Sequence, residues 1–158
     1  MKQTNVSALI GLLHDECILL DAAVNTLVLS IQKCKAIGVK PIYSFEEQES
    51  FDSLSSKFNR ASDLFTQKLI RTCWMLMHES FAPFIDLMNL CEKMRIIADA
   101  NQMIAIRDMR NQIAHEYIPE ALFELVPEVM DLSQHLIENI YVCKQFIHKR
   151  EWLVADNS

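Results

Sequence analysis

The scarcity of glycine is the feature that most constrains the fold of this chain. Only 2 of its 158 residues are glycine, where average usage would give roughly 11. Sheet-rich folds use glycine in hairpin turns and bulges, and the chain contains no Asn-Gly, Asp-Gly or Gly-Gly pair. Phosphate-binding loops and dinucleotide fingerprints need glycine as well. The sequence therefore predicts an all-α protein of long helices joined by short connections, and it excludes glycine-built phosphate sites.

Composition and charge narrow the class of protein further. Hydrophobic residues make up 51% of the chain and charged residues 23%, which suits one domain with a packed core. The net charge of −6 repels nucleic acid and anionic membranes as a whole, so any contact with RNA must be local. No unbroken apolar run approaches the length of a membrane span, and the first ten residues lack the pattern of a secretory signal. We therefore expect a cytoplasmic protein that does not associate with membranes.

The cysteines suggest no zinc site. They are spread along the chain without a Cys-x-x-Cys pair: Cys17, Cys34, Cys73, Cys91 and Cys143. A zinc site needs clustered ligands, and the nearest hint is His14 with Cys17 on one helical face. We interpret the cysteines as buried or half-buried thiols of a reducing compartment, and we expect neither a metal nor another cofactor.

A stripe of apolar residues at helical spacing predicts a long first helix over residues 6–34. Its members alternate spacings of three and four: Ile10, Leu13, Cys17, Leu20, Val24, Leu27, Ile31 and Cys34. Gly38 and Pro41 follow as a C-cap glycine and a helix breaker. The stripe is typical of bundle core. A partner-binding seam is the alternative, and the additional apolar residues Leu19 and Leu29 would let the helix also support a homodimer.

Two more helices follow in the middle of the chain. Ser44, with Glu47 three residues later, forms a capping-box pattern that begins a helix reaching to about residue 78. Residues 80–83 predict a turn, and the apolar spacing of residues 84–94 predicts a short third helix.

The last two predicted helices include the region that carries the chemistry. Asp99 is a suitable N-cap for a fourth helix that runs to His115. Pro119 suits the first turn of a fifth helix that ends at Lys149, and Pro127 either kinks or restarts that helix. The sequence thus predicts an up-down bundle of about five helices over residues 1–150. A C-terminal tail over 151–158 follows, of which residues 152–158 are expected to be frayed.

The most informative segment is Arg110-Asn111-Gln112-Ile113-Ala114-His115-Glu116-Tyr117, at the end of the fourth predicted helix. Arginine presents a planar fork of donors that matches a phosphate, and histidine moves protons near neutral pH. Together they fit cleavage of RNA by attack of the ribose 2′-OH on its own phosphate, with His115 as acid or base and Arg110 stabilising phosphoryl charge. Asn111 could hold the substrate or orient His115. The alternative for the same residues is helix capping and surface electrostatics.

The segment resembles the R-x4-H-x-Y motif of the HEPN superfamily, in its HepT-like branch. The five-helix layout and the position of the motif in the fourth helix resemble that fold over about residues 5–150, and residues 56–64 resemble the second helix of some HepT-like proteins. The resemblance implies a metal-independent ribonuclease toxin that acts as a homodimer, with paired motifs lining a cleft at the interface. It implies that Arg110 and His115 are catalytic and that Asn111 supports them. A second copy would also supply a second His115 for a reaction that moves two protons.

The resemblance further implies a protein partner and a modification site. Proteins of this kind are commonly encoded beside a minimal nucleotidyltransferase that acts as the antitoxin. Tyr117 would be the residue that receives AMP from that partner. An adenylyl group two residues from His115 adds bulk and negative charge where an RNA phosphate should bind.

Charge near the motif is balanced, so RNA contacts require further cations. We expect Arg107, Lys57 and Arg60 to contribute. Two wider basic groups could also help, although each can equally be a solvated helix face: Lys57, Arg60, Lys68 and Arg71, or Lys144, Lys149 and Arg150. Two other functions remain open: a non-catalytic module that binds a nucleotidyltransferase or a nucleotide, and a scaffold dimer built on the first helix.

Overall fold

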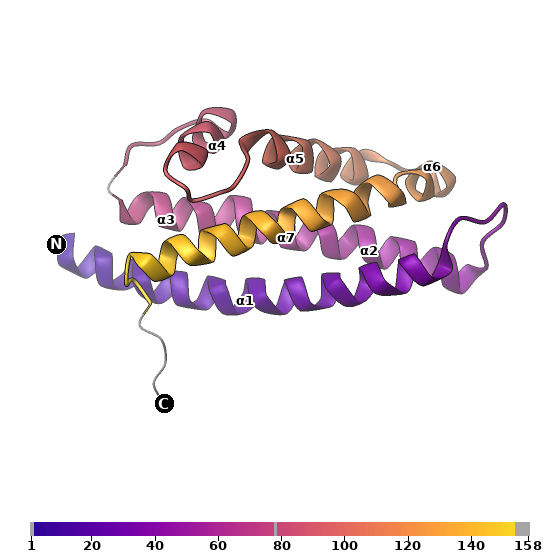
Figure 1. The fold of residues 1–158 in the computed structure, drawn as a ribbon, viewed down its shortest axis with the longest axis horizontal. Coiled ribbons are helices and arrows are strands. Elements are labelled where there is room, and N and C mark those ends of the chain that lie inside the picture. The colour runs from indigo at the N-terminus through magenta and orange to yellow at the C-terminus, as the bar shows by residue number, and fades with distance from the viewer. Residues whose placement is uncertain (1, 78, 154–158) are drawn as a thin grey trace.

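The computed structural model describes residues 2–77 and 79–153, with side chains from residue 5 onward. Within those residues the chain is helical and contains no strand, which confirms the predicted all-α class. Four long segments run alternately up and down the bundle (Figure 1). They are α1 (Lys2–Ile37), a continuous helix made of α2 (Phe45–Asp63), η1 (Leu64–Leu69) and α3 (Ile70–Leu76), then α5 (Ala100–His115) and α7 (Val126–Lys149). Two short helices, α4 (Phe84–Lys93) and α6 (Pro119–Glu124), complete the described part.

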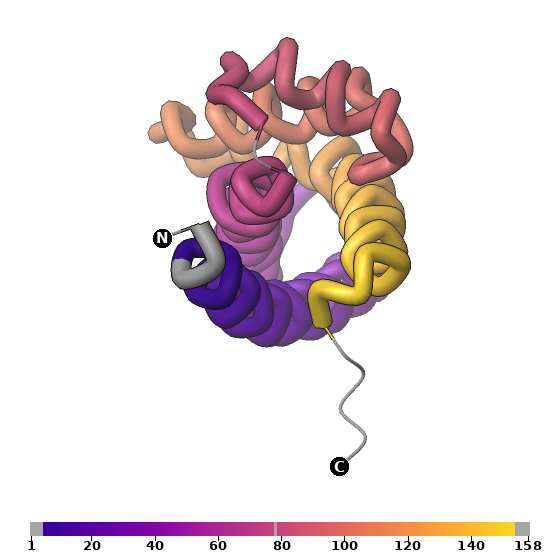
Figure 2. Tube along the Cα trace, turned by 90° about the vertical axis from the view of Figure 1, so that its left-hand side faces the viewer, coloured from indigo at the N-terminus to yellow at the C-terminus, as the bar shows by residue number. Residues whose placement is uncertain are grey.

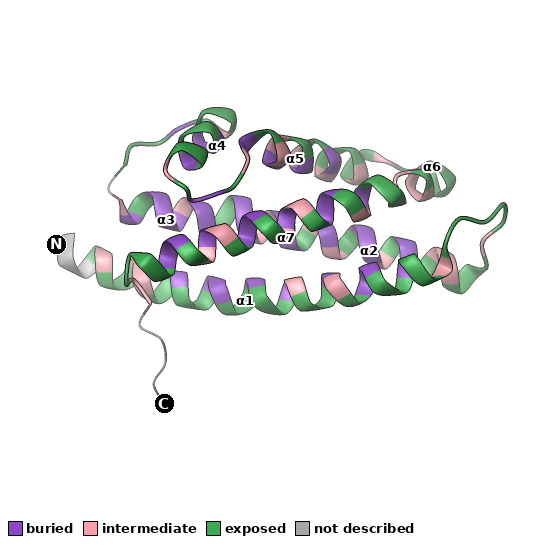
Figure 3. Ribbon diagram, viewed as in Figure 1, coloured by how far each residue is buried: buried purple, intermediate pink, exposed green. Residues whose placement is uncertain are grey.

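The predicted stripe of α1 lies in the core. Leu13, Leu20 and Leu27 are fully buried, and α1 packs mainly against α2 and α3. Seen along the bundle, α1, the α2–α3 helix and α7 surround the core, while α4 and α5 cover the side opposite α1 (Figure 2). The outward face of α1 is exposed (Figure 3) and carries Leu19 and Leu29.

The mean hydropathy of α1 is high even though no unbroken apolar run in it is long. Residues Asn5–Ile37 are long and apolar enough to cross a membrane by length and composition, with a mean hydropathy of 1.4 over the best window. Of that window, 39% is buried inside the bundle. The polar residues of α1 interrupt every apolar run but weigh little in a windowed average, which explains the difference.

Helix ends follow the local signals in the sequence. Gly38 has φ 72° and its N–H donates to the carbonyl of Cys34 at 3.3 Å, as a left-handed C-cap glycine should. The capping box forms as predicted: the N–H of Glu47 donates to the Ser44 hydroxyl at 3.2 Å, and the N–H of Ser44 donates to the Glu47 carboxylate at 2.8 Å. These caps set where α1 ends and α2 begins.

The second predicted helix is continuous, but its middle is wound differently. Residues Leu64–Leu69 form a π-helix, in which the Thr66 hydroxyl donates to the carbonyl of Ser62 at 2.8 Å. A π-turn contains about one more residue than an α-turn and so rotates the side chains that follow it. Asp63 is the last residue before this change of winding.

The prediction of about five helices was too low, because the last predicted helix is divided. Within the described residues there are six, counting α2, η1 and α3 as one. Helix α6 ends at Glu124 and α7 begins at Val126, with Pro127 in its first turn. Proline lacks the N–H that would continue the hydrogen bonds of the preceding helix. Pro127 therefore lies at the start of a new helix, α7, rather than at a kink within a continuous one.

The described part of the C-terminal tail packs against the bundle. The ring of Trp152 lies 5.6 Å from that of Phe146, and the Arg150 guanidinium lies 5.0 Å from the Phe146 ring. The prediction of a frayed tail was wrong for Trp152 and Leu153, because both side chains find apolar surface on α7 and the core. Residues 154–158 lie outside the described residues.

Helix α5 is fixed at its start by a fully buried asparagine of α7. The Asn139 Oδ1 accepts hydrogen bonds from the N–H of Ala98 at 2.9 Å and of Asp99 at 3.1 Å. Its Nδ2 donates to the carbonyl of His135 at 2.7 Å and to the Gln102 side chain at 3.0 Å. As predicted, Asp99 caps α5 by accepting from the N–H of Gln102 at 3.0 Å. This network sets the position of the helix that carries the motif.

Candidate functional site

Helix α5 ends within the motif, at His115, because of the residues that follow the helix. Pro119 cannot donate to the carbonyl of His115, and a residue before proline favours extended backbone. Ile118 is indeed extended, with φ −97° and ψ 115°. The N–H of Ile118 donates to the Glu116 carboxylate at 3.0 Å, which fixes the connection between α5 and α6. His115 is therefore the last residue of a regular helix.

Arg110 is held by a carboxylate from another helix. Its Nε donates to Asp63 Oδ1 and its Nη2 donates to Asp63 Oδ2, both at 2.9 Å. The side chains are about one-third exposed, at 31% for Arg110 and 33% for Asp63. This hydrogen bonding raises the pKa of Arg110 above its ordinary value. The guanidinium is thus both permanently charged and fixed in direction.

The pairing leaves one edge of the guanidinium available. A guanidinium carries five N–H donors in a rigid plane, and Asp63 takes only the edge formed by Nε and one N–H of Nη2. Among the described residues, no other hydrogen bond is made by the Arg110 side chain. The outer edge, formed by Nη1 and the remaining N–H of Nη2, can still donate two hydrogen bonds to the oxygens of a phosphate in fork geometry.

His115 and Asn111 lie one turn apart on the exposed flank of α5, with Ala114 on the neighbouring part of the same surface. All three are exposed, and no side-chain hydrogen bond of His115 or Asn111 occurs within the part of the chain that the structure describes. In a regular α-helix, residues five apart point about 140° apart around the axis. Within a single chain, Arg110 and His115 therefore point in different directions from α5.

Tyr117 is displayed to solvent in the connection after α5. Its side chain is 86% exposed, and the next helix, α6, begins two residues later at Pro119. A protein partner can reach its hydroxyl without unfolding any helix. This position suits a residue that is modified by another protein.

The three basic residues expected to bind RNA lie in different environments. Arg107 is on α5, and its guanidinium lies 4.5 Å from the centre of the Phe84 ring of α4. Arg60 is exposed on α2. Lys57 lines a groove between α1 and α2 with Leu29, Ser30 and Lys33 among others. Of the three, Arg107 is the only one on the same helix as the motif.

The wider basic groups are also separated in the fold. Lys68 and Arg71 line a cavity beside α1, where Arg71 lies 5.8 Å from the centre of the Phe81 ring. On α7, Lys144 pairs with Asp21 of α1 at 2.6 Å. Arg150 stacks on aromatic rings at the end of α7. None of these residues is brought to Arg110 by a hydrogen bond or an ion pair within the described residues.

Two residues of α2, Asp63 and Asn59, were not assigned a role from the sequence. Asp63 holds the guanidinium, and Asn59, one turn earlier on α2, has a buried side-chain oxygen without a hydrogen-bond partner. An unpaired buried acceptor is uncommon. The only signal in the sequence was the likeness of residues 56–64 to the second helix of some HepT-like proteins, which named no partner for Arg110.

The cysteines are free and buried, as expected. Burial raises the pKa of the Cys91 thiol to about 12 and that of Cys17 to about 11. The neighbouring Cys73 thiol, together with burial, raises the pKa of Cys143. Such thiols are poor nucleophiles. In residues 2–77 and 79–153, no group of three or more His, Cys, Asp or Glu side chains is arranged to hold a metal ion.

Comparison of the chain with models of protein families, with curated proteins and with solved structures found no match.

Proposed function

We propose that this protein is a metal-independent RNA endonuclease of the HEPN type, which acts as the toxin of a toxin–antitoxin pair in the cytoplasm. The observation that carries the proposal is the bidentate pair between Asp63 and Arg110. It fixes a guanidinium with one free edge on the same helix as an exposed histidine. A fixed cation and a proton-transferring group are what phosphodiester cleavage needs.

The proposed reaction uses only side chains of the motif. The ribose 2′ oxygen attacks the adjacent phosphorus, the bond from phosphorus to the 5′ oxygen breaks, and a 2′,3′-cyclic phosphate forms. One His115 accepts the proton of the 2′-OH, and a second donates a proton to the departing 5′ oxygen. Arg110 stabilises the charge that develops on the phosphoryl oxygens. Asn111 supports His115 or the substrate.

The active form in this proposal is a homodimer in which two α5 helices face each other. Arg110 and His115 of one chain point in different directions around α5, so a two-fold partner is needed to face Arg110 with a histidine. Ala114, exposed between them, is small enough to let the second helix approach closely. Arg107, Arg60 and Lys57 would add contacts to the RNA backbone on the outer sides of the cleft.

The proposed partner is a minimal nucleotidyltransferase that transfers AMP to Tyr117. Exposure of the Tyr117 hydroxyl, immediately before α6, supports this assignment. Intact-mass measurement after co-expression with such an enzyme should show one added adenylyl group. The addition should vanish in Tyr117→Phe and persist in Tyr141→Phe, a matched change at another exposed tyrosine. An unchanged mass, or loss of the addition only in Tyr141→Phe, would contradict the assignment.

Toxicity in cells tests the function as a whole. Induced expression of the chain should arrest growth and shorten cellular RNA, and His115→Ala should relieve both effects. Growth arrest that His115→Ala leaves unchanged would contradict the proposed nuclease.

The ion pair between Arg110 and Asp63 also favours a second function. Because Asp63 already neutralises the guanidinium, the same exposed surface would also suit a non-catalytic module that recognises a partner protein or a nucleotide. This candidate predicts a stable complex that survives His115→Ala, together with no cleavage of RNA by the wild-type protein.

A further inference from the structure

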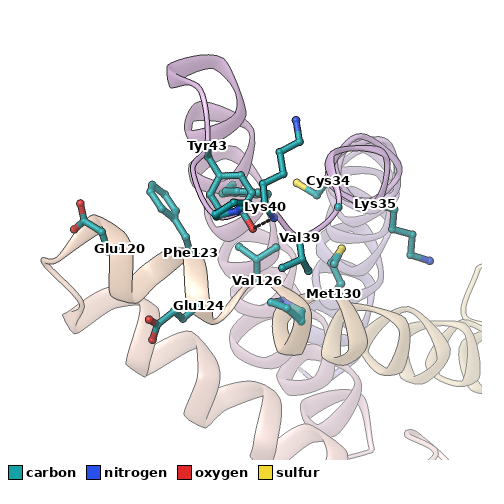
Figure 4. A pocket seen from close by; sticks show the side chains of 14 residues that line it. Cys34, Lys35, Val39, Lys40, Tyr43, Glu120, Phe123, Glu124, Val126 and Met130 are labelled. Carbon is teal, nitrogen blue, oxygen red and sulfur yellow. Dashed lines mark hydrogen bonds between the residues drawn. The ribbon is translucent and has the colours of Figure 1, made fainter.

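A cavity of about 620 Å³ lies at the end of the bundle where α1 meets α6 and α7 (Figure 4). The last turn of α1 and the connection to α2 form one wall, and α6 with the start of α7 forms the other. This volume is within the range of roughly 300–1,000 Å³ typical of ligand pockets. The mechanism proposed above uses none of the residues that line the cavity.

The floor of the cavity is aromatic. The rings of Tyr43 and Phe51 meet edge to face with centroids 4.7 Å apart, and the Phe123 ring lies 5.6 Å from that of Phe51. The Tyr43 hydroxyl accepts a hydrogen bond from the N–H of Lys40 at 3.2 Å, which holds the connecting loop over this floor. The cavity therefore has an apolar floor of aromatic rings in contact with one another.

Apolar side chains extend the surface beyond the cavity. Val39 is 90% exposed, Ile42 84% and Phe45 73%, all in or next to the loop that forms one wall. Adjacent exposed apolar residues of this size mark sites of protein contact. Of the three, only Val39 lines the cavity, so a small molecule inside it would leave Ile42 and Phe45 in water, whereas a protein segment that extends from the cavity along the loop would cover them.

The other wall of the cavity is negatively charged. Glu120 and Glu124 line it from α6 and are exposed. Neither forms an ion pair within the described residues, and residues 119–134 contain four acidic residues and no lysine or arginine: Glu120, Glu124, Glu128 and Asp131. On the opposite wall, Lys40 is already paired with Glu47, and Lys35 points away from the other labelled side chains (Figure 4). The unpaired charge at the opening is thus acidic.

From these observations we infer that the cavity and its apolar rim are a docking site for an amphipathic helix of a partner protein, with large apolar residues on one face and lysine or arginine beside them. The apolar residues enter the cavity and cover Val39, Ile42 and Phe45, and the basic residues face Glu120 and Glu124. A partner bound there lies next to Tyr117, because α6 begins two residues after it. The docking site stands without the proposed catalysis; only the identification of its occupant with the nucleotidyltransferase rests on the proposed function.

The experiment uses two synthetic 18-residue helical peptides of the same apolar pattern, one of leucine and lysine and one of leucine and glutamate. Fluorescence anisotropy should show saturable binding of the leucine–lysine peptide and at least tenfold weaker binding of the other. Backbone NMR shifts caused by the bound peptide should be confined to residues 34–51 and 117–130. Shifts spread over the whole surface, no binding, or equal binding of the two peptides would overturn the inference.

Variants on the exposed rim separate the two components of recognition without touching the core. The double substitution Ile42→Ser and Phe45→Ser should weaken binding of the leucine–lysine peptide at least tenfold. Glu120→Lys with Glu124→Lys should reverse the preference between the peptides. Leu29→Ser, at an exposed leucine on α1, is the matched control and should change neither. Unchanged binding in both double variants would overturn the inference.

One further measurement identifies the occupant. If light scattering shows that the Ile42→Ser and Phe45→Ser variant loses a dimer formed by the wild type, the face joins two copies of this chain and the proposed occupant is wrong. Retention of RNA cleavage by this variant is expected, so failure of the docking site and failure of the nuclease are distinguishable.

Discussion

Asp63 of α2 fixes the guanidinium of Arg110 on α5 through two hydrogen bonds of 2.9 Å. The two residues are 47 positions apart in the chain, yet their pairing decides which edge of the arginine can meet a substrate. Because the pair connects α2 to α5, it also stabilises the packing of these two helices. Both roles can be measured separately.

The stability of the pair can be measured with a double-mutant cycle. Asp63→Asn, Arg110→Gln and the double variant should give a coupling free energy of about 1 kcal/mol by urea unfolding, since both side chains remain about one-third exposed. The value should fall with added salt. A coupling of zero in dilute buffer would show that the pair is not formed in solution.

The positioning role of Asp63 predicts a larger effect on catalysis than on stability. Asp63→Asn should lower kcat for RNA cleavage on the order of 10²-fold with little change in KM, because a misdirected arginine loses its alignment with the phosphate. Asp52→Asn, at an exposed position of the same helix, is the control and should have no effect. Equal activity of the two variants would contradict the positioning role.

Asn139 should be among the most sensitive polar positions in the bundle. Asn139→Ala leaves the part-buried N–H groups of Ala98 and Asp99 without their acceptor, which costs about 1–3 kcal/mol of unfolding free energy. Asn89→Ala, on the exposed face of α4, should change it by less than about 0.5 kcal/mol. Similar urea midpoints for the two variants would contradict the proposed role of Asn139 in fixing α5.

The proposed dimer depends on close approach at Ala114. Ala114→Arg should convert the dimer to a monomer in light scattering, because a large charged side chain would stand between the two α5 helices. Ala105→Arg, exposed on the opposite side of the same helix, should leave the dimer intact. A wild-type monomer, or a dimer that survives Ala114→Arg, would contradict this arrangement of the two copies.

The buried thiols predict a loss of stability at alkaline pH. Because burial raises the pKa of Cys91 from 9.0 to about 12, the folded state keeps this thiol neutral while the unfolded chain ionises it. The contribution is therefore complete below pH 9 and is lost between pH 9 and pH 12. Urea unfolding with a reducing agent should show the stability difference between wild type and Cys91→Ala shrinking by about 1 kcal/mol from pH 9 to pH 10. A constant difference would contradict the raised pKa.

Local patterns in the sequence predicted most of the helices and their ends. The stripe of α1, the capping box at Ser44, the cap at Asp99 and the end of α5 near Pro119 all involve residues within one or two turns of each other. Such signals act through backbone hydrogen bonds and proline geometry, which a sequence displays directly. Patterning also identified the inward face of α1, since burial follows the helical period.

What the sequence could not predict depends on pairing between distant segments. Neither the Asp63–Arg110 pair nor the hydrogen bonds of Asn139 to the residues just before α5 have a local pattern, because each joins two segments whose relative rotation is set by packing. The π-helical turn after Asp63 rotates the side chains that follow it relative to those before it. A regular spacing of apolar residues in the sequence does not reveal this rotation. The residue identities at the motif were visible, but the orientation of Arg110 was not.

Cleavage of RNA by the purified protein tests the central proposal most directly. With EDTA present, the wild-type protein should cleave single-stranded RNA to products with 2′,3′-cyclic phosphate and 5′-hydroxyl ends. His115→Ala and Arg110→Ala should each lower the rate by about 10²-fold or more, while His148→Ala, at an exposed histidine of α7, should leave it unchanged. The absence of cleavage by the wild type, or an undiminished rate in His115→Ala, would contradict the proposed function.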